Sequence, residues 1–233
     1  MNILRIFHKL YQHYGPQNWW PADNPLEIII GALLVQGTNW KNAEKAIRKL
    51  EKSGLLNVQC LANLDEEDLA NILRPAGFHR IKARRIKNFI SKLLDDFNGE
   101  LKKLFELDTK DLRRWLLEIK GIGKETADNI ILYAANKLIF PIDKFTIRIL
   151  SRLGFKVTNE YDDIQKLIEE EIPNDLRVYK ELRALFVKHA KEHCRKSPLC
   201  DNCPLSSDCS YLKHHLKNIA RRKMKKDIAK PIM

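Results

Sequence analysis

The sequence lacks several features that mark other classes of protein. No uninterrupted apolar run approaches the ~20 residues that cross a membrane, and the opening Met-Asn-Ile-Leu-Arg does not read as a signal peptide. We therefore expect a cytoplasmic protein without a membrane partner. Alternating apolar and polar runs joined by hairpin turns are also missing, which argues against a β fold. The sequence shows no internal repeats and no long linker.

Acidic residues are too few to balance the basic ones. The 233 residues include 42 Lys and Arg against 30 Asp and Glu, which gives a formal charge of +12 at pH 7. A positive field of this size raises encounter rates with polyanions and allows counterions to be released on binding. Charge alone is weak evidence, because many basic proteins bind no nucleic acid. The balance favours DNA or RNA as a partner only if motifs agree.

Apolar residues recur at three- and four-residue steps through most of the chain, which is the period of an amphipathic helix. The stretch from Leu26 to Val35 is apolar on nearly all sides and is typical of a central helix. We therefore predict an all-α fold of about ten short helices. The clearest apolar faces are Ile86, Phe89, Ile90, Leu93, Leu94 and Phe97; Leu112, Trp115, Leu116 and Ile119; and Ile164, Leu167, Ile168 and Ile172.

Four cysteines cluster near the C-terminus, with the spacing C-x5-C-x2-C-x5-C: Cys194, Cys200, Cys203 and Cys209. A zinc ribbon has two C-x2-C units a dozen or more residues apart, so this pattern differs from it. Four clustered thiolates favour a [4Fe–4S] cluster, with Zn²⁺ as the less favoured ion. The alternative is two disulfides or merely buried cysteines, which the odd fifth residue, Cys60, and the lack of secretory features disfavour.

The segment from Leu117 to Ile131 predicts a helix, a tight turn and a second helix that begins near Lys124. Gly121 and Gly123 permit backbone angles that a Cβ hinders, and their N–H groups can face a phosphate beside the second helix. Such a turn binds the DNA backbone without reading sequence. An ordinary helical hairpin, in which glycine serves only the turn, is an equal alternative.

The order of hairpin, Pro141-Ile-Asp143-Lys-Phe-Thr-Ile-Arg148 and cysteine loop resembles the helix-hairpin-helix DNA glycosylases of the endonuclease III superfamily, over residues 17 to 212. The resemblance implies a two-domain fold, in which a six-helix barrel carries the hairpin and a helical domain carries the cluster. We place the barrel at 24–135, the cluster domain at 1–23 and 136–212, and a basic tail at 213–233. The partner is then double-stranded DNA with a damaged base, bound by a monomer and, in a prokaryote, at the nucleoid.

Asp143 matches the family's essential aspartate. Cleavage of an N-glycosidic bond builds positive charge on the deoxyribose, and a nearby carboxylate stabilises that charge or activates water. The alternative is an N-terminal helix cap, a common place for Asp. Both roles can coexist at one carboxylate.

Glu125 departs from the family's bifunctional members, which place a Schiff-base lysine two residues after the second hairpin glycine. Lys124 is adjacent, but one residue along a helix turns the side chain by ~100°, which suits a phosphate contact better than the pocket. The departure predicts a monofunctional enzyme that releases a base and leaves an abasic site, with Glu125 lining the base pocket.

Trp19, Trp20 and Trp40 resemble the aromatic pocket of the alkylpurine branch, the 3-methyladenine glycosylases. Indole rings stack on a flipped base, and their negative faces favour a purine made cationic by alkylation. Such a base is also a good leaving group. The alternative is that these tryptophans belong to the core or to a domain interface, where most Trp is used.

Two further positions follow from the resemblance. Gln36 matches a residue that, in the family, enters the duplex at the gap left by the flipped nucleotide. The alternative is that Gln36 is an exposed polar residue at the end of a helix. Phe78 lies in a loop that resembles the family's loop that inserts into the strand opposite the flipped nucleotide. The alternative is that Phe78 is a core residue. Cationic charge beside the duplex is expected from Arg80, Lys82, Arg84 and Arg85, and in the cysteine loop from Arg195 and Lys196.

Two other functions compete with alkylpurine excision. One is an endonuclease III type glycosylase and lyase acting on oxidised pyrimidines, which Glu125 disfavours. The other is a DNA-binding module without catalysis, which has no need of Asp143.

In the cysteine loop, the first gap of five residues differs from the family's usual six. This difference casts doubt on the shape of the loop more than on the binding of a metal by the four cysteines.

Overall fold

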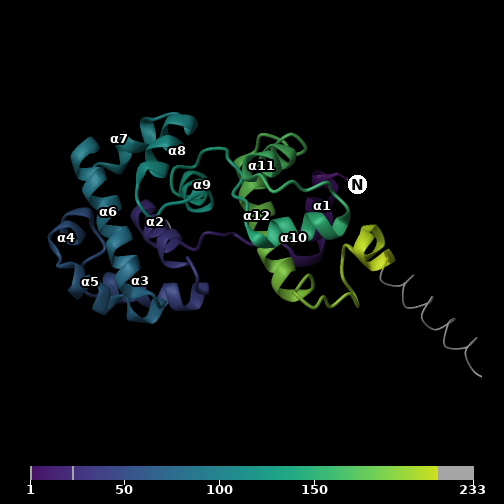
Figure 1. The fold of residues 1–233 in the computed structure, drawn as a ribbon, viewed down its shortest axis with the longest axis horizontal. Helices are drawn as coiled ribbons and strands as arrows, with labels where there is room; N and C mark the ends of the chain where they lie inside the picture. Colours follow the sequence, from purple (N-terminus) through teal and green to yellow (C-terminus); the bar gives the residue numbers. More distant parts are fainter. Residues whose placement is uncertain (1, 23, 215–233) are drawn as a thin grey trace, which may run out of the picture. The chain divides into compact units, whose positions relative to one another are not determined.

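The computed structural model describes residues 2–22 and 24–214 and is all-helical over them (Figure 1). It contains twelve α-helices, somewhat more than the expected ten, and no strand among these residues. None of the helices described is long and apolar enough to cross a membrane. The α-helices are α1 (Ile3–Tyr14), α2 (Pro25–Leu34), α3 (Trp40–Lys52), α4 (Val58–Asn63), α5 (Glu66–Ile72), α6 (His79–Phe97), α7 (Leu101–Glu106), α8 (Thr109–Glu118), α9 (Lys124–Tyr133), α10 (Lys144–Leu153), α11 (Tyr161–Glu169) and α12 (Leu176–Glu192), and two 3-10 turns are η1 (Arg74–Ala76) and η2 (Ser206–Asp208).

The chain forms two compact units. We call one the hairpin unit, made of Asn18–Pro141 and Asn174–Lys180, and the other the cysteine unit, made of Met1–Gln17, Ile142–Pro173 and Glu181–Met233. These boundaries differ by about six residues from the expected 23/24 and 135/136, and the start of α12 belongs to the hairpin unit. The predicted basic tail from 213 lies, beyond residue 214, outside the described residues.

Most helices begin at an Asn or Asp whose side chain caps the first turn. The side-chain oxygen accepts a hydrogen bond from a backbone N–H that has no partner inside the helix, which stabilises a helix by ~1 kcal/mol relative to Ala. The residues that act in this way are Asn2, Asn24, Asn39, Asn57, Asp65, Asp108 and Asp143. Local sequence therefore sets where these seven helices begin.

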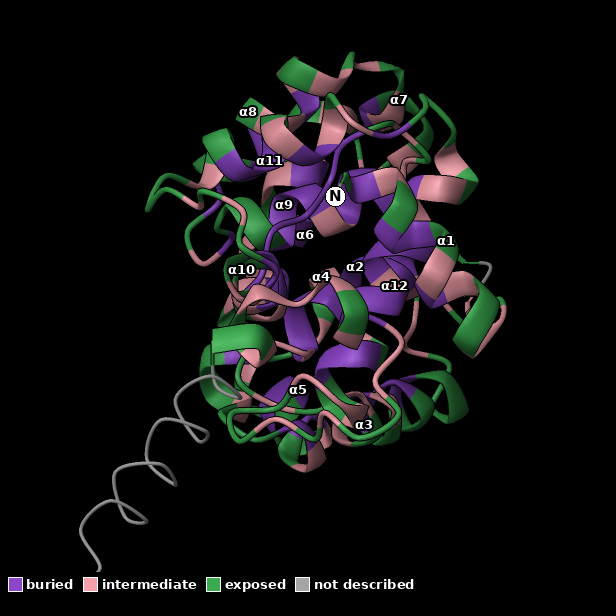
Figure 2. Ribbon diagram, turned by 90° about the vertical axis from the view of Figure 1, so that its right-hand side faces the viewer, coloured by how far each residue is buried: buried purple, intermediate pink, exposed green. Residues whose placement is uncertain are grey.

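The core of the hairpin unit surrounds α2, as the apolar run predicts. Leu26 and the residues from Ile28 to Leu34 are buried, and α9, largely buried too, contacts this helix (Figure 2). Gly31 allows the Trp20 ring to approach, because a Cβ there would lie 2.9 Å from Trp20 Cζ2. The unit has eight α-helices, α2 to α9, two more than the resemblance implies, and α4 and α7 have only six residues each.

The predicted apolar faces lie largely in the two cores. Ile86, Phe89, Ile90 and Leu93 of α6 are buried, while Leu94 and Phe97 are half-buried. All four predicted residues of the face that ends at Ile119 are buried, as are Ile164, Ile168 and Ile172 around α11. Helical periodicity therefore predicted the buried sides of these helices correctly, with the errors at their ends.

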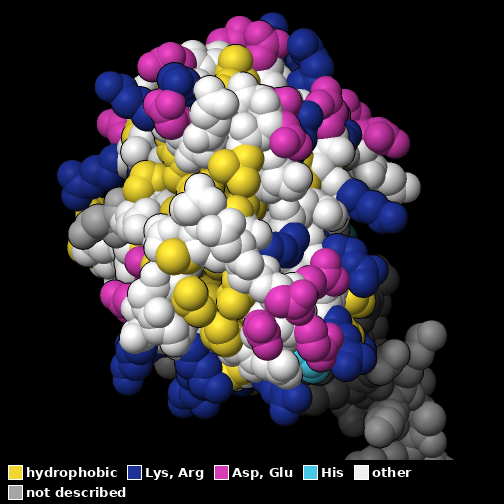
Figure 3. Space-filling view, turned by 90° about the vertical axis from the view of Figure 1, so that its left-hand side faces the viewer, with side chains coloured by type: hydrophobic (Ala, Val, Ile, Leu, Met, Phe, Trp, Pro, Cys, Tyr) yellow, Lys and Arg dark blue, Asp and Glu magenta, His cyan; other side chains and the backbone are white. Residues whose placement is uncertain are grey.

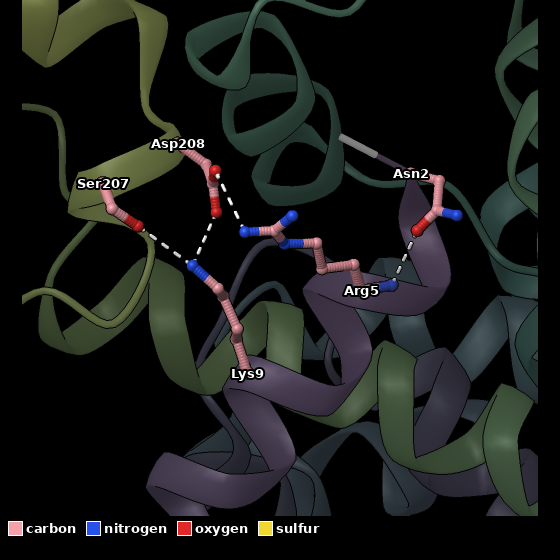
Figure 4. A network of polar contacts seen from close by, with 5 residues as sticks. All are labelled: Asn2, Arg5, Lys9, Ser207 and Asp208. Carbon is pink, nitrogen blue, oxygen red and sulfur yellow. Dashed lines mark hydrogen bonds and ion pairs between the residues drawn. The ribbon is translucent and has the colours of Figure 1, made fainter.

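In the cysteine unit, charged residues of α1 hold the cysteine segment (Figure 4). The Lys9 ammonium donates to Asp208 Oδ2 at 2.6 Å and to Ser207 Oγ at 2.9 Å, and Arg5 lies 3.6 Å from the same carboxylate. The hydrogen bond from Lys9 lowers the pKa of Asp208. Segments almost 200 residues apart in sequence are thereby joined beside the cysteines.

Candidate functional site

Asp143 is the N-cap of α10 and is 7% exposed. Its Oδ1 accepts a hydrogen bond from the Thr146 N–H at 2.7 Å, and its Oδ2 lies 3.2 Å from the Arg183 guanidinium of α12. The capping role is therefore confirmed, and both oxygens are held in fixed directions. Arg183, itself 7% exposed, was not among the predicted residues, because nothing in the sequence links two positions 40 residues apart.

The helices that hold the aspartate and its arginine also hold the cysteine segment. From α10, Arg152 Nη1 donates to Cys194 Sγ at 3.2 Å and to the Arg195 carbonyl at 2.6 Å. From the same helix, Arg148 Nε donates to the Cys194 carbonyl at 2.8 Å. The position of α10 therefore depends on the conformation of the segment that follows α12.

All four clustered cysteines line one pocket in the cysteine unit, together with His189, His193 and Arg152. The chain's five cysteines are free, so the disulfide alternative is wrong. Cys60 lies on α4 of the hairpin unit. The sequence therefore separated the four clustered cysteines from the fifth correctly.

The thiols do not form a preformed site for one metal ion. Within the part of the chain that the structure describes, no group of three or more His, Cys, Asp or Glu converges as an ion requires, and Zn²⁺ needs its sulfurs ~2.3 Å from one point. In a [4Fe–4S] cluster each thiolate binds a different iron atom, and such a cluster remains a prediction from the four soft donors and their spacing.

His189 and Tyr14 lie behind the cysteines and were not among the predicted residues. The Tyr14 hydroxyl is 3.0 Å from His189 Nδ1, and His189 Nε2 is 3.9 Å from Cys203 Sγ. Burial, followed by the neighbouring His193 and His13, lowers the pKa of His189 to about 4. Burial also raises the pKa values of Cys200 and Cys203, which disfavours their thiolate forms.

The predicted hairpin is present, with its turn between α8 and α9. Gly121 has φ +103°, and a Cβ there would lie 2.4 Å from Arg85 Cγ, so glycine is required for both backbone and space. Gly123 has φ −99°, which any residue adopts, and no atom of the described residues lies within 4 Å of its Cβ position. The expectation that both glycines serve unusual backbone angles is correct for Gly121 and wrong for Gly123.

Gln36 is half-buried and bonded to the hairpin, so its alternative as an exposed helix end is wrong. Its Nε2 donates to Thr126 Oγ1 at 2.8 Å and to the Gly121 carbonyl at 3.2 Å, and its Oε1 accepts from Arg85. Insertion into DNA would require these hydrogen bonds to break.

Phe78 is 68% exposed, so its alternative as a core residue is wrong. It precedes α6 with φ +48° and ψ +34°, directly after Gly77 with φ +67°. The ring lies beside Gly37, where a Cβ would be 3.7 Å from Phe78 Cε2. The two residues predicted to enter the duplex, Gln36 and Phe78, are therefore close together.

The expected cations of α6 are largely committed to partners. Arg80 pairs with Glu67 and Arg84 with Glu66, both at 3.2 Å. Lys82 is 1% exposed, and Arg85 is bound to Gln36. Acidic and basic side chains are intermixed on the face drawn in Figure 3. Lys82 therefore supplies no charge at the surface, whereas Arg80 and Arg84 are exposed beside acidic partners and their position beside the duplex remains a prediction.

The three tryptophans form one aromatic group in the hairpin unit, and all three are half-buried. Ring centroids are 5.2 Å apart for Trp19 and Trp20, 4.9 Å for Trp19 and Trp40, and 5.2 Å for Trp20 and Trp40. Tyr133 of α9 joins them 5.4 Å from Trp20 and was not predicted. Trp20 Nε1 is buried with no acceptor among the described residues.

The two charged residues at the start of α9 are exposed. Lys124 and Glu125 occupy its first turn, where Glu125 complements the helix dipole and the backbone N–H groups suit an anion. The contact of Glu125 with the flipped base and the contact of Lys124 with a phosphate remain predictions.

Comparisons with known proteins agree with this architecture. A family model described as HhH-GPD superfamily base excision DNA repair protein matches residues 30–174. The chain is 46% identical, over 211 residues, to a Methanocaldococcus jannaschii protein named provisionally as a DNA repair glycosylase, covering 89% of this chain and 95% of the relative. It is 30% identical over 198 residues to endonuclease III of Sulfolobus acidocaldarius, covering 84% and 86%.

One solved structure carries the comparison to three dimensions. The fold matches that of H. pylori 3-methyladenine DNA glycosylase bound to 1,N6-ethenoadenine with a TM-score of 0.74 and 27% identity, over 82% of this chain and 98% of that one. The all-α endonuclease III-like fold is thereby confirmed. The chain belongs to the HhH-GPD superfamily and is a DNA glycosylase of base excision repair.

Proposed function

We propose that the enzyme hydrolyses the N-glycosidic bond of an alkylated purine, such as 3-methyladenine, in double-stranded DNA. The observation that carries this proposal is the group of Trp19, Trp20 and Trp40, three half-buried indoles in mutual contact. The indoles meet edge to face or tilted, and the free face of an indole attracts an electron-poor, cationic base. The likeness to a 3-methyladenine glycosylase solved with a modified purine supports the same substrate class.

Trp20 adds a polar feature to this base site. Its buried Nε1 is a hydrogen-bond donor, and leaving such a group unpaired costs ~1–3 kcal/mol. Motion of the neighbouring half-buried rings would bring an acceptor of the base within reach. Glu125, exposed on the first turn of α9 in the same unit, completes the proposed pocket.

Asp143 supplies the chemistry in this proposal. Its carboxylate, oriented by the Thr146 N–H and by Arg183, stabilises the positive charge that develops on the deoxyribose and orients the attacking water. The proton of that water passes to the carboxylate or to the leaving base. Both oxygens are held by protein partners, so the direction of the carboxylate is fixed before substrate binds.

The absence of a lysine at position 125 supports hydrolysis without strand cleavage. A glycosylase that also cleaves the strand uses an amine that forms a Schiff base with the sugar, and this chain has Glu125 at that place. Treating the protein and a damaged duplex with borohydride should therefore trap little covalent adduct. A high yield that disappears in Lys124→Ala or Lys120→Ala would overturn this part of the proposal.

The hairpin turn is proposed to hold a phosphate of the DNA. Gly123 is explained neither by its φ nor by packing, since the space beside it is open among the described residues. A missing side chain there lets a phosphate oxygen approach the N–H groups that begin α9. Lys124 adds a positive charge at the same place.

We further propose that Cys194, Cys200, Cys203 and Cys209 hold a [4Fe–4S] cluster. The soft donors and their arrangement around one pocket support it. When bound, the cluster fixes the loop that carries Arg195 and Lys196, whose charges suit phosphates, and takes no part in base release. Anaerobically purified protein without iron and without a cluster's visible absorbance would contradict this.

One experiment separates the competing functions. Duplexes that each carry one damaged base, alkylated purines and oxidised pyrimidines among them, are incubated with the protein, and free base and strand breaks are scored separately. Released alkylpurine without breaks supports the proposal, and released oxidised pyrimidine with breaks supports the endonuclease III type, which the Sulfolobus relative favours. Binding without any release supports the non-catalytic module.

A further inference from the structure

Lys82 is the largest fully buried side chain of the described residues, with 1% exposure. Lysine is almost never buried to this extent unless its charge has a partner. Its ammonium donates to the Ala76 carbonyl at 2.7 Å. Burial, followed by the Arg85 guanidinium, lowers the pKa of Lys82 to about 8. Burial of a lysine ammonium costs free energy, and a structural or functional role of Lys82 is expected to offset it.

The two ends of Lys82 hold the chain on both sides of one short turn. The side chain holds the Ala76 carbonyl, at the end of η1, and the backbone N–H donates to the Phe78 carbonyl at 3.0 Å in the first turn of α6. Between them lie Gly77 and Phe78, both in the left-handed region. Lys82 therefore fixes the segment that sets the direction of the Phe78 side chain.

Phe78 itself gives no packing reason for this arrangement. Its ring is 68% exposed, and a bulky residue with φ +48° is strained. Strain that the surrounding structure maintains is found most often at binding and active sites. The ring lies over Gly37, next to Gln36, so it shares its surface with the other residue predicted to enter the duplex.

We propose that Lys82 is a positioning residue that holds Phe78 in the conformation in which its ring enters the duplex on the strand opposite the damaged base. This rests on the proposed function, because it requires an enzyme that flips a nucleotide out of DNA. Lys82 itself touches no DNA in this proposal. Its effect on base release passes through Phe78 alone.

Lys87 provides a matched control on the same helix. It also donates to main-chain carbonyls, those of Leu61, Ala62 and Leu64 at 3.0, 2.7 and 2.5 Å, at the end of α4. Lys87→Met therefore removes a similar lysine–carbonyl interaction away from the turn at Phe78. Lys87→Met therefore measures the effect on base release of losing a lysine–carbonyl interaction elsewhere on α6.

The test is a double-mutant cycle with two readouts. Lys82→Met, Phe78→Ala, the double variant, Lys87→Met and Lys87→Met with Phe78→Ala are compared in single-turnover base release. The second readout is the fluorescence of 2-aminopurine placed opposite a tetrahydrofuran abasic analogue in a duplex, which rises when that base is unstacked. Circular dichroism at the assay temperature shows that each variant is folded.

Phe78→Ala is expected to lower base release about tenfold, the loss of one base–aromatic stack, and to suppress the fluorescence rise. Lys82→Met should give a similar loss, and the double variant should be no worse than Phe78→Ala. Lys87→Met should retain the fluorescence rise. If Lys82→Met does not fold, Lys82→Gln, which keeps an N–H donor, should fold and give an intermediate fluorescence rise.

Failure of this inference differs from failure of the proposed function. Wild-type protein that releases no base from any duplex overturns the function. Wild-type protein that raises the fluorescence while Lys82→Met or Lys82→Gln raises it equally overturns the inference. Full additivity of the Lys82 and Phe78 changes, or a Lys87→Met protein that loses the fluorescence as well, also overturns it.

Discussion

Asp143 combines a structural role with the catalytic role that we propose for it. As N-cap it satisfies an N–H of α10, and as partner of Arg183 it fixes a buried guanidinium. A carboxylate held on both oxygens is preorganised for a developing positive charge, since no reorganisation is needed during the reaction. The capping role and the proposed catalytic role can therefore coexist at this carboxylate.

Asp143→Asn should lower base release by about 10²-fold or more while leaving DNA affinity and the N-cap of α10 intact. It also removes the charge that faces the buried Arg183, so circular dichroism must show that the variant is folded. Asparagine caps a helix as well as aspartate does, but it carries no negative charge for the deoxyribose. Single-turnover kinetics and gel-shift titration measure the two effects. Asp108→Asn, at the N-cap of α8, is the control and should keep full activity. Unchanged release in Asp143→Asn would show that another group does the chemistry.

Lys82 should give a pH dependence of stability in the alkaline range. Its pKa is about 8 when folded against 10.5 ordinarily, so between these values the unfolded chain binds a proton that the folded one does not. The free energy of unfolding should therefore rise with pH from about 8 to 10.5, by at most about 3 kcal/mol. Urea titrations of wild type and Lys82→Met should diverge over this window, and parallel curves would contradict the prediction.

At the scale of elements, the hairpin, Gln36 and α6 form one hydrogen-bonded assembly inside the hairpin unit. Arg85 packs under Gly121 and bonds to Gln36, and Asn88 Nδ2 of the same helix donates to the Lys120 carbonyl at 3.0 Å. The turn proposed to hold phosphate is thus supported from behind by α6. The helix that positions Phe78 also positions the hairpin.

The two hairpin glycines should respond oppositely to alanine. Gly121→Ala places a Cβ against Arg85 at φ +103° and should cost more than about 1 kcal/mol of unfolding free energy. Gly123→Ala meets open space, and its effect on stability should not exceed the cost of alanine at the N-cap of α9, about 1 kcal/mol. It should nevertheless weaken duplex binding about tenfold by blocking the phosphate.

Thermal melts and gel shifts on the two alanine variants give both quantities. A Gly123→Ala protein that binds DNA as wild type does would remove the phosphate role from this turn.

At the scale of the whole molecule, the cysteine unit is built from three distant parts of the chain. α1 holds the cysteine segment through Lys9, and α10 holds it through Arg152 while carrying Asp143 at its other end. A group bound by the four thiols would therefore stabilise the helices that hold Asp143, the carboxylate proposed to be catalytic.

Cys203→Ser should abolish iron binding and lower the thermal stability of the protein, because it removes one of the four proposed cluster ligands and a contact of His189. Cys60→Ser is the matched control and should keep the iron of wild type, since Cys60 lies on α4 of the hairpin unit. Iron analysis and visible absorbance decide the matter. Equal iron content in both variants would refute the cluster.

The sequence by itself determined what is local and periodic. Asn and Asp side chains set helix starts, three- and four-residue spacing set the buried faces, and the order of hairpin, aspartate and cysteines indicated the family. These follow from near neighbours in the chain, whose backbone and solvent preferences act before any tertiary contact forms.

Only the tertiary structure decided which partners these residues have. It paired Arg183 with Asp143, buried Lys82 beneath the turn at Phe78, bonded Gln36 to the hairpin and gave Arg80 and Arg84 acidic partners. Each pairing joins helices or turns whose approach depends on how whole apolar faces pack. The sequence alone does not indicate whether a charged or amide side chain will contact water, a carbonyl or another charge.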